Sequence, residues 1–143
     1  MSNVFLRRVK HDDLDLLYQW ANDSVVRNNS FNTDHISYIN HVEWFNKIMS
    51  DSAVLQFILM DDDTPVGQIR LNVVNEEAEI GYSIGSEFRG QGYGHKILQL
   101  VADEVRRSYP EIKNLIAKVK PKMLLRVRFL NSQGTRNPIF AIL

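Results

Sequence analysis

The chain has 143 residues, a length that suits a single domain with a sizeable core. Lysine and arginine together number 17, as do aspartate and glutamate, and this zero net charge argues against a nucleic-acid partner held by a general basic field. The sequence contains no cysteine, which excludes disulfides, thiolate nucleophiles and cysteine metal sites.

The sequence of the first third of the chain predicts one strand followed by two helices. Val4–Val9 is predicted to form a strand. Asp12 and Asp13 are suited to capping a helix that continues to Trp20. The polar stretch 22–33 is predicted to be irregular, and residues 36–49 are predicted to form a second helix. One face of that helix is predicted to carry Ile39, Val42, Phe45 and Ile48.

Three strands are predicted to follow. Residues 53–60 and 66–74 form a predicted hairpin around a turn at 61–65. A second turn at 75–77 leads into a predicted buried strand at Glu79–Ile84, which is rich in β-branched and aromatic residues.

A glycine-rich turn comes next and precedes a long amphipathic helix. Gly85 and Ser86 end the strand, and the run Arg89-Gly90-Gln91-Gly92-Tyr93-Gly94 leads into a helix predicted from His95. Three glycines allow backbone N–H groups to approach a ligand closely, and the positive end of a helix dipole favours phosphate. Arg89 adds a forked cation suited to phosphate oxygens. The core face of the helix is predicted to hold Ile97, Leu98, Val101, Ala102 and Val105.

Two common phosphate-binding patterns do not fit this turn. In the dinucleotide pattern GxGxxG the third glycine position falls on Ile97. The P-loop pattern ends in Gly-Lys-Ser or Gly-Lys-Thr, which Gly94-His95-Lys96 does not supply. Pro110 is predicted to stop the helix, and Leu115–Val119 to form a further strand.

The turn resembles the pyrophosphate loop of the GNAT acetyltransferase superfamily. That loop has Arg or Gln, two residues, Gly, one residue, and Gly or Ala, and Arg89, Gly92 and Gly94 fill these positions. The order of predicted elements is also similar over residues 4–121. The resemblance implies an α/β (α+β) fold, with a mixed, mostly antiparallel central sheet flanked by helices. It implies an acetyltransferase domain at 1–121 and an atypical tail at 122–143.

The resemblance also implies a cofactor site and a catalytic residue. Acetyl-CoA is the implied co-substrate, with Ser83 and Ile84 bonding its pantetheine arm through their backbone. The pyrophosphate is expected to lie on the turn, formed by Arg89, Gly90, Gln91, Gly92, Tyr93 and Gly94. Glu79 is the candidate general base that removes a proton from the acceptor amine. The alternatives are that Glu79 faces solvent or pairs with Arg70.

The acceptor is implied by a finer resemblance. The segment from Trp20 to Phe31 and the helix with His41 and Trp44 are similar to acetyltransferases of the pseudaminic-acid pathway, which acetylate nucleotide-linked amino sugars. On this basis Arg27, Phe31 and His41 are expected to line a pocket for a small-molecule amine. Trp44 is alternatively a core residue. The competing functions are a protein N-terminal acetyltransferase, an inactive acyl-CoA-binding module and a nucleotide-binding regulatory domain.

The tail departs from the family pattern. After Pro121 the family's asparagine and its tyrosine, the expected general acid, have no counterpart, so the last elements of the fold are expected to be missing or altered. A one-base slip near the codon of Lys122 restores a similar ending, so we hypothesise a frameshift there. Sheet edges and apolar surface left uncovered predict association, as a homodimer or a domain-swapped oligomer.

The remaining patterns exclude other classes. The N-terminus lacks the apolar region of a signal peptide, and no apolar run is long enough to span a bilayer. We therefore expect a soluble cytoplasmic protein with no membrane partner. No histidine or carboxylate spacing is typical of a metal site, so no metal is expected.

Overall fold

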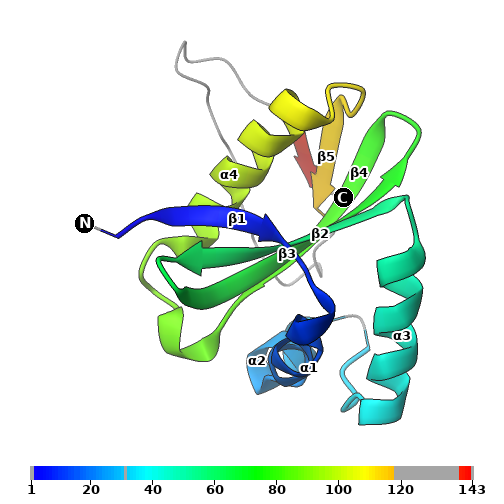
Figure 1. The fold of residues 1–143 in the computed structure, drawn as a ribbon, viewed down its shortest axis with the longest axis vertical. Coiled ribbons are helices and arrows are strands. Elements are labelled where there is room, and N and C mark those ends of the chain that lie inside the picture. Colours follow the sequence, from blue (N-terminus) through cyan, green and yellow to red (C-terminus); the bar gives the residue numbers. More distant parts are fainter. Residues whose placement is uncertain (1, 31, 118–138, 143) are drawn as a thin grey trace.

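A twisted sheet forms the centre of the molecule (Figure 1). The computed structural model describes residues 2–30, 32–117 and 139–142, the last range by its backbone alone. In this part of the chain six strands pair in sequence order. They are β1 (Val4–Arg8), β2 (Val54–Asp61), β3 (Thr64–Val74), β4 (Glu77–Ile84), β5 (Asn114–Ala117) and β6 (Ile139–Ile142). Strands β1 to β4 are antiparallel, whereas β4–β5 and β5–β6 are parallel pairs. This confirms the predicted mixed, mostly antiparallel sheet.

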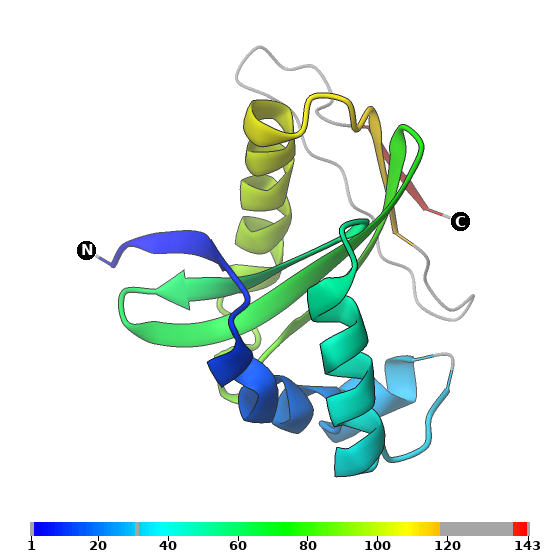
Figure 2. The same ribbon diagram turned by 45° about the vertical axis from the view of Figure 1, so that its right-hand side comes forward.

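Helices cover both faces of the sheet. The longest, α4 (Tyr93–Ser108), lies on one face, and three helices lie on the other (Figures 1 and 2). These three are α1 (Leu14–Ala21), α2 (Ser24–Asn29) and α3 (Tyr38–Ser50). Short 3-10 turns, η1 (His11–Asp13) and η2 (Ser86–Phe88), precede α1 and follow β4. The molecule therefore has three layers, with the sheet in the middle.

The two faces of the sheet differ in chemistry because side chains alternate along each strand. Towards α4 the face is apolar, and the five residues predicted for the core face of α4 are all buried against it. Towards α1 and α3, Ile58 and Met60 pack with Leu17 and Phe45 in a second, smaller core. Beside this core the same face becomes polar. Its polar residues are Gln56 on β2, Gln68, Arg70 and Asn72 on β3, and Glu79 and Ser83 on β4.

The largest departure from the predicted elements is α2, which lies inside the stretch expected to be irregular. Asp23 explains it, because its Oδ1 accepts hydrogen bonds from the N–H groups of Val25 and Val26, at 3.1 and 3.2 Å. This is a helix N-cap, which satisfies amides that have no partner within the helix. The segment is too short for apolar periodicity to reveal it, so the prediction of an irregular loop was wrong.

Several element boundaries also differ. The strand expected from Glu79 begins at Glu77, and the helix expected from His95 begins at Tyr93, directly after Gly92 in a left-handed conformation. Strand β6 was not predicted. The predicted strand end at Lys118 and Val119 lies outside the described residues, as does the tail from 122 to 138. The proposed division at residue 121 therefore remains a prediction.

Candidate functional site

A cavity of about 640 Å³ lies between the polar face of the sheet and the helices α1 to α3. Trp20 on α1, Val26 on α2 and His41 on α3 contribute to its helical wall. The sheet contributes residues from β2, β3 and β4, and Ala117 at the described end of β5. A volume in this range is typical of small-molecule sites. The sheet residues on the cavity include Gln56, Gln68, Arg70, Asn72, Glu79, Gly81 and Ser83.

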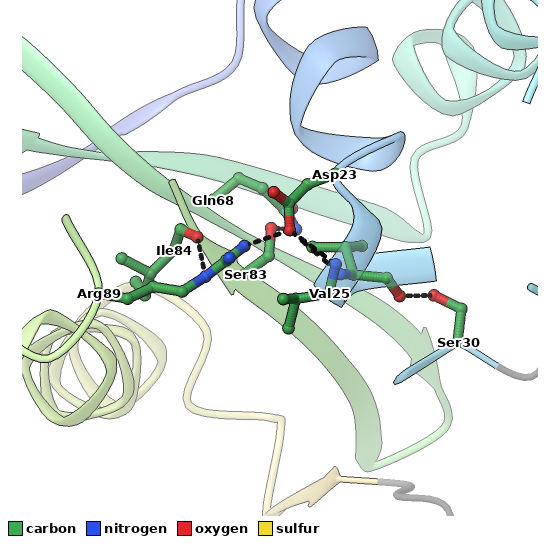
Figure 3. A network of polar contacts seen from close by, with 8 residues as sticks. Asp23, Val25, Ser30, Gln68, Ser83, Ile84 and Arg89 are labelled. Atoms are coloured by element: carbon green, nitrogen blue, oxygen red, sulfur yellow. Dashed lines mark hydrogen bonds and ion pairs between the residues drawn. The ribbon is translucent and has the colours of Figure 1, made fainter. Parts of the chain in front are cut away.

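A chain of hydrogen bonds crosses three strands at one end of this cavity. Gln56 Nε2 donates to Gln68 Oε1 at 3.1 Å, and Gln68 Nε2 donates to Ser83 Oγ at 3.1 Å. Gln56 is 5% exposed, and its Oε1 has no hydrogen-bond partner. The second of these bonds is visible in Figure 3. The chain fixes the three side chains in a row and leaves one buried oxygen available at its end.

Arg70 forms the cationic part of the cavity floor. Its guanidinium lies over the Trp44 ring, with Cζ 5.3 Å from the ring centroid, and its buried Nε has no hydrogen-bond partner. Burial lowers the pKa of Arg70, and the nearby Glu79 charge acts in the opposite direction. Trp44, expected to belong either to the acceptor pocket or to the core, contacts both, because it also packs against the smaller core.

Glu79 lies on the cavity as the sequence predicted, and its side chain is exposed. It is opposite Asn72 on β3 and Ile116 on β5. Both alternatives raised from the sequence have a counterpart in the structure, because Glu79 is exposed and its charge also acts on Arg70. An exposed carboxylate at the mouth of a cavity is placed to accept a proton from a ligand, directly or through water.

Arg89 connects the glycine-rich turn to α2 (Figure 3). Its Nη2 donates to Asp23 Oδ1 at 2.6 Å, and its Nε donates to the Ile84 carbonyl at 3.1 Å. The hydrogen bond from Arg89 lowers the pKa of Asp23. The sequence assigned Arg89 to a phosphate and did not anticipate this ion pair. Arg89, Ser83 and Ile84 all contribute to the wall of the cavity.

The turn itself has the backbone geometry that the sequence suggested. Gly90 and Gly92 have φ of +77° and +86°, a conformation that favours glycine, and a Cβ on either would meet nothing within 4 Å. Before the turn, the Phe88 N–H donates to the Gly85 carbonyl, and after it the Lys96 N–H donates to the Gly92 carbonyl. The first amides of α4 between them, at Tyr93 and Gly94, have no carbonyl within the helix to bond. Open space and such amides fit an anion.

Side-chain bonds hold this turn in place. Gln91 Nε2 donates to the Glu87 carbonyl at 3.3 Å, and the Tyr93 hydroxyl donates to Asp61 Oδ2. The hydrogen bond to Asp61 raises the pKa of Tyr93. The turn is thus anchored both within itself and to the end of β2.

The three residues expected to contact the acceptor have different surroundings. Arg27 lies on the cavity, but its Nη1 donates to the Asn32 and Asp34 carbonyls and its Nη2 to Ser30 Oγ. His41 also reaches the cavity, although it is 2% exposed and its Nε2 lies 3.1 Å from the Leu14 carbonyl. Burial lowers the pKa of His41, which favours the neutral ring. Phe31 lies outside the described residues.

Sequence reasoning missed the polar floor made by Gln56, Gln68 and Arg70. Its signal is present, because polar residues alternate with apolar ones in the strand at 66–74. Gln56 was hidden within an almost continuous apolar run, where a single polar residue gives no period. The pairing register of β2, β3 and β4 brings these residues side by side, and the sequence alone does not reveal that register.

Comparison with known proteins gives a consistent picture. The sequence profile of the family described as acetyltransferase (GNAT) domain matches residues 3–134, which extends past residue 121 into the tail. An uncharacterized N-acetyltransferase p20 from Bacillus licheniformis is 26% identical over 139 residues, covering 92% of this chain and 78% of that protein.

Solved structures share the fold. A spermidine N-acetyltransferase from Vibrio cholerae, in complex with CoA and spermine, superposes with a TM-score of 0.68 at 21% identity, over 75% of this chain and 66% of that chain. The aminoglycoside acetyltransferase AAC(6')-Ib, in complex with coenzyme A, gives a TM-score of 0.73 at 18% identity, over 85% of this chain and 78% of that chain. This chain therefore spans about two thirds of the first protein's length.

Two kinds of feature are absent from the described part of the chain. No helix there has the length and apolarity to cross a membrane. Within the same residues, histidine and carboxylate side chains form no cluster of three or more that is suited to a metal ion.

Proposed function

Because the chain belongs to the GNAT acetyltransferase family, we propose that it transfers an acetyl group from acetyl-CoA to the primary amine of a nucleotide-linked amino sugar. The dependence on acetyl-CoA and the transfer to an amine follow from the family. The nature of the acceptor is our proposal. It rests on one observation, a cavity that is lined by Glu79 and three arginines and that reaches Arg89, the first residue of the glycine-rich turn.

The residues of the turn fit a diphosphate. The amides of Tyr93 and Gly94 begin α4, and the positive φ angles at Gly90 and Gly92 leave open space in front of them. Ser83 and Ile84 line the cavity, and the pantetheine arm would bind along them. The bound cofactor supplies an activated acetyl thioester. Arg89 supports this site by holding the end of β4 to α2.

Glu79 is the group that we assign to proton removal. An amine arrives as an ammonium ion and must lose a proton before it can attack a carbonyl. Glu79 is an exposed carboxylate on the cavity, close enough to Arg70 for their charges to interact.

The charges on the cavity favour an anionic acceptor over a polycation. Arg27 and Arg70 face a single carboxylate, Glu79, while Arg89 is paired with Asp23. The Vibrio cholerae protein binds spermine, but its identity to this chain is only 21%, so its acceptor does not transfer to this chain. A diphosphate-linked sugar is compatible with the excess of arginine, whereas a polyamine would be repelled.

The test is a steady-state assay of CoA thiol release with acetyl-CoA and a panel of acceptors. We expect turnover with a nucleotide-linked amino sugar, and a rate at least tenfold lower with spermidine or with a peptide N-terminus. Turnover confined to the peptide would support the protein N-terminal alternative. Binding of CoA without turnover on any amine would support an inactive binding module.

Replacing Glu79 separates catalysis from binding. The Glu79→Gln variant is expected to lose 10² to 10⁴-fold in kcat, the usual contribution of general-base catalysis. The melting temperature of the variant should still rise normally with acetyl-CoA, because Glu79 lies away from the turn. A kcat within threefold of the parent would exclude Glu79 as the base.

A further inference from the structure

Three side-chain atoms in the described part of the chain are buried without a hydrogen-bond partner. They are Arg27 Nε, Gln56 Oε1 and Arg70 Nε, and all three residues line the same cavity. Buried polar atoms in native proteins are nearly always satisfied, and leaving one unsatisfied costs about 1–3 kcal/mol. Three such atoms around one cavity indicate that a ligand completes their bonding.

Two of these atoms come from directly opposed residues. Gln56 on β2 is the register partner of Arg70, and Arg70 is in turn the register partner of Gly81 on β4. Gly81 carries no side chain, and a Cβ built there would meet nothing within 4 Å. The space over Gly81 is therefore open, and the two neighbouring register positions hold the buried, unbonded atoms Arg70 Nε and Gln56 Oε1.

The Trp44 ring fixes the guanidinium of Arg70. The Cζ atom lies 5.3 Å from the ring centroid, and Arg70 also lines the cavity. A guanidinium forms paired hydrogen bonds with carboxylate or phosphate oxygens. Arg70 is therefore a cation on the cavity floor whose chemistry suits an anionic group.

Glu79 alone does not balance Arg70. Burial lowers the pKa of Arg70 even though the Glu79 charge raises it, so the attraction to Glu79 is the smaller of the two effects. Arg27 faces the same cavity as a further cation, whereas Arg89 is neutralised by Asp23. Asn72 and His41, which also line the cavity, add no negative charge. The floor is therefore electrostatically suited to one more anionic group.

We propose that Gln56 and Arg70 form a specificity subsite that binds an anionic oxygen of the acceptor to Arg70 and a neighbouring hydroxyl to Gln56 Oε1. The acceptor class is then an amine that also carries a phosphate or carboxylate close to a hydroxyl, as amino-sugar phosphates do. This deepens the proposed function and rests on it for the amine. The subsite itself requires only the anion and the hydroxyl.

The test measures binding and turnover separately. Glucose 6-phosphate carries the anion and hydroxyls without an amine, so it tests the subsite independently of acetyl transfer. Trp44 lies under Arg70 and provides a fluorescence signal, and calorimetry gives a second measurement. We expect saturable binding of glucose 6-phosphate and weaker binding of glucose by tenfold or more. Inorganic phosphate tests whether the anion binds without the sugar. Glycerate, which has a carboxylate beside a hydroxyl, tests whether a carboxylate can take the place of the phosphate.

Variants of Arg70 then test whether glucose 6-phosphate binds at the polar floor of the cavity. Arg70→Gln is expected to weaken glucose 6-phosphate binding 10 to 100-fold, which is the worth of a charge-assisted hydrogen bond. Arg70→Lys should retain part of the glucose 6-phosphate binding through its charge alone. The matched control is Arg107→Gln, which removes an exposed arginine on α4, outside the cavity, and should change nothing.

Gly81→Ala tests whether the acceptor occupies the open space above Gly81. The new methyl group enters open space in the free protein, so stability and the thermal shift with acetyl-CoA should be retained. Because the methyl group lies beside Arg70, we expect KM for glucosamine 6-phosphate to rise at least tenfold with kcat within a factor of two.

The outcomes are distinguishable. Binding of glucose 6-phosphate that is lost in Arg70→Gln supports the subsite even if no amine is acetylated. Turnover of nucleotide-linked amino sugar with unchanged KM in Arg70→Gln and Gly81→Ala would overturn the subsite and leave the proposed function standing. Equal KM values for glucosamine and glucosamine 6-phosphate would also overturn it.

Discussion

At the scale of single residues, Arg89 has a different environment from the one its motif suggests. The pattern assigned it to a phosphate, and the structure has it bonded to Asp23 and to the Ile84 carbonyl. It therefore links β4 and the adjoining glycine-rich turn to the start of α2, which lies 66 positions away in the sequence. Any contribution of Arg89 to cofactor binding includes this link, since the turn and α2 are held together through it.

The ion pair makes a prediction about pH. The pKa of Asp23 is lowered by Arg89, so the pair stabilises the fold above the ordinary pKa of an aspartate, about 4, and this stability is lost as pH falls below it. Asp23→Asn keeps the helix cap and removes the charge. We expect the variant to be less stable by about 1 kcal/mol at pH 7, with the difference becoming smaller as pH falls below about 4. Denaturant unfolding at several pH values measures this.

The control for this experiment is Asp103→Asn, which removes an exposed carboxylate that pairs with Arg106 on α4. Its effect should stay within about 0.5 kcal/mol, because exposed ion pairs contribute little. A stability difference for Asp23→Asn that is the same at pH 3 and pH 7 would show that the ion pair is not its origin.

Arg89→Ala extends the same reasoning to the cofactor. We expect most of the melting-temperature increase produced by acetyl-CoA to disappear in this variant, because the turn loses its anchor to α2. Asp23→Asn should reduce the increase only in part, since Arg89 retains its bond to the Ile84 carbonyl. An unchanged increase in Arg89→Ala would remove this residue from the cofactor site.

At the scale of elements, the close packing of β3 against β4 gives a further prediction. A Cβ on Gly67 of β3 would meet the Ser83 carbonyl oxygen at 2.9 Å and Ile84 Cδ1 at 2.8 Å. The Ser83 carbonyl belongs to the backbone of β4 and cannot rotate away. Gly67→Ala is therefore expected to lower the free energy of unfolding by about 1–3 kcal/mol, in contrast to the neutral Gly81→Ala on the neighbouring strand. Equal stability of the two variants would contradict this account of the packing.

The helix α3 shows why an element is easier to predict than its buried face. The sequence correctly indicated a helix there, but its face was drawn through residues three apart, beginning at Ile39. A helix turns once every 3.6 residues, so such a row drifts around the axis. Ile39 is 71% exposed, and the buried residues of α3 are His41 and Phe45, four apart. In α4, where the predicted residues mixed intervals of three and four, all five are buried.

The site was predictable where a local motif carries it and not where the sheet assembles it. Glu79, Ser83 and Arg89 were found from one continuous stretch, and they do line one cavity. Gln56 and Arg70 are brought together by the pairing of β2 with β3, which no short pattern encodes. The ion pair between Asp23 and Arg89 spans 66 positions of the sequence and was likewise out of reach.

At the scale of the whole molecule, the sheet separates two environments. Helix α4 lies on one side of the sheet and α1 to α3 lie on the other (Figure 2). The face towards α4 holds the apolar core, and the other face carries the cavity with its polar floor. Among the described strands, β1 and β6 form the two edges of the sheet. An edge strand presents unpaired backbone groups that invite pairing with another chain.

Association is the prediction at this scale. The chain mass is 16.6 kDa, and light scattering over a range of concentrations is expected to show a species of twice that mass. The reason is the departure of the tail from the family pattern, which we attribute to a frameshift near Lys122. A single species of 16.6 kDa at all concentrations would contradict the association. Gene sequencing tests the frameshift directly, because codons after Lys122 that forbid the alternative reading would exclude it.

The alternation of side chains along β4 has a practical consequence for protein engineering. Glu79, Gly81 and Ser83 line the cavity, whereas Ala78 and Ile80 belong to the apolar core on the opposite side. A library that varies positions 81 and 83 and keeps the proposed base Glu79 would therefore explore new acceptor preferences while leaving the apolar core intact. In this one strand, the residues that set acceptor selectivity alternate with the residues that stabilise the fold, so the two properties can be changed separately.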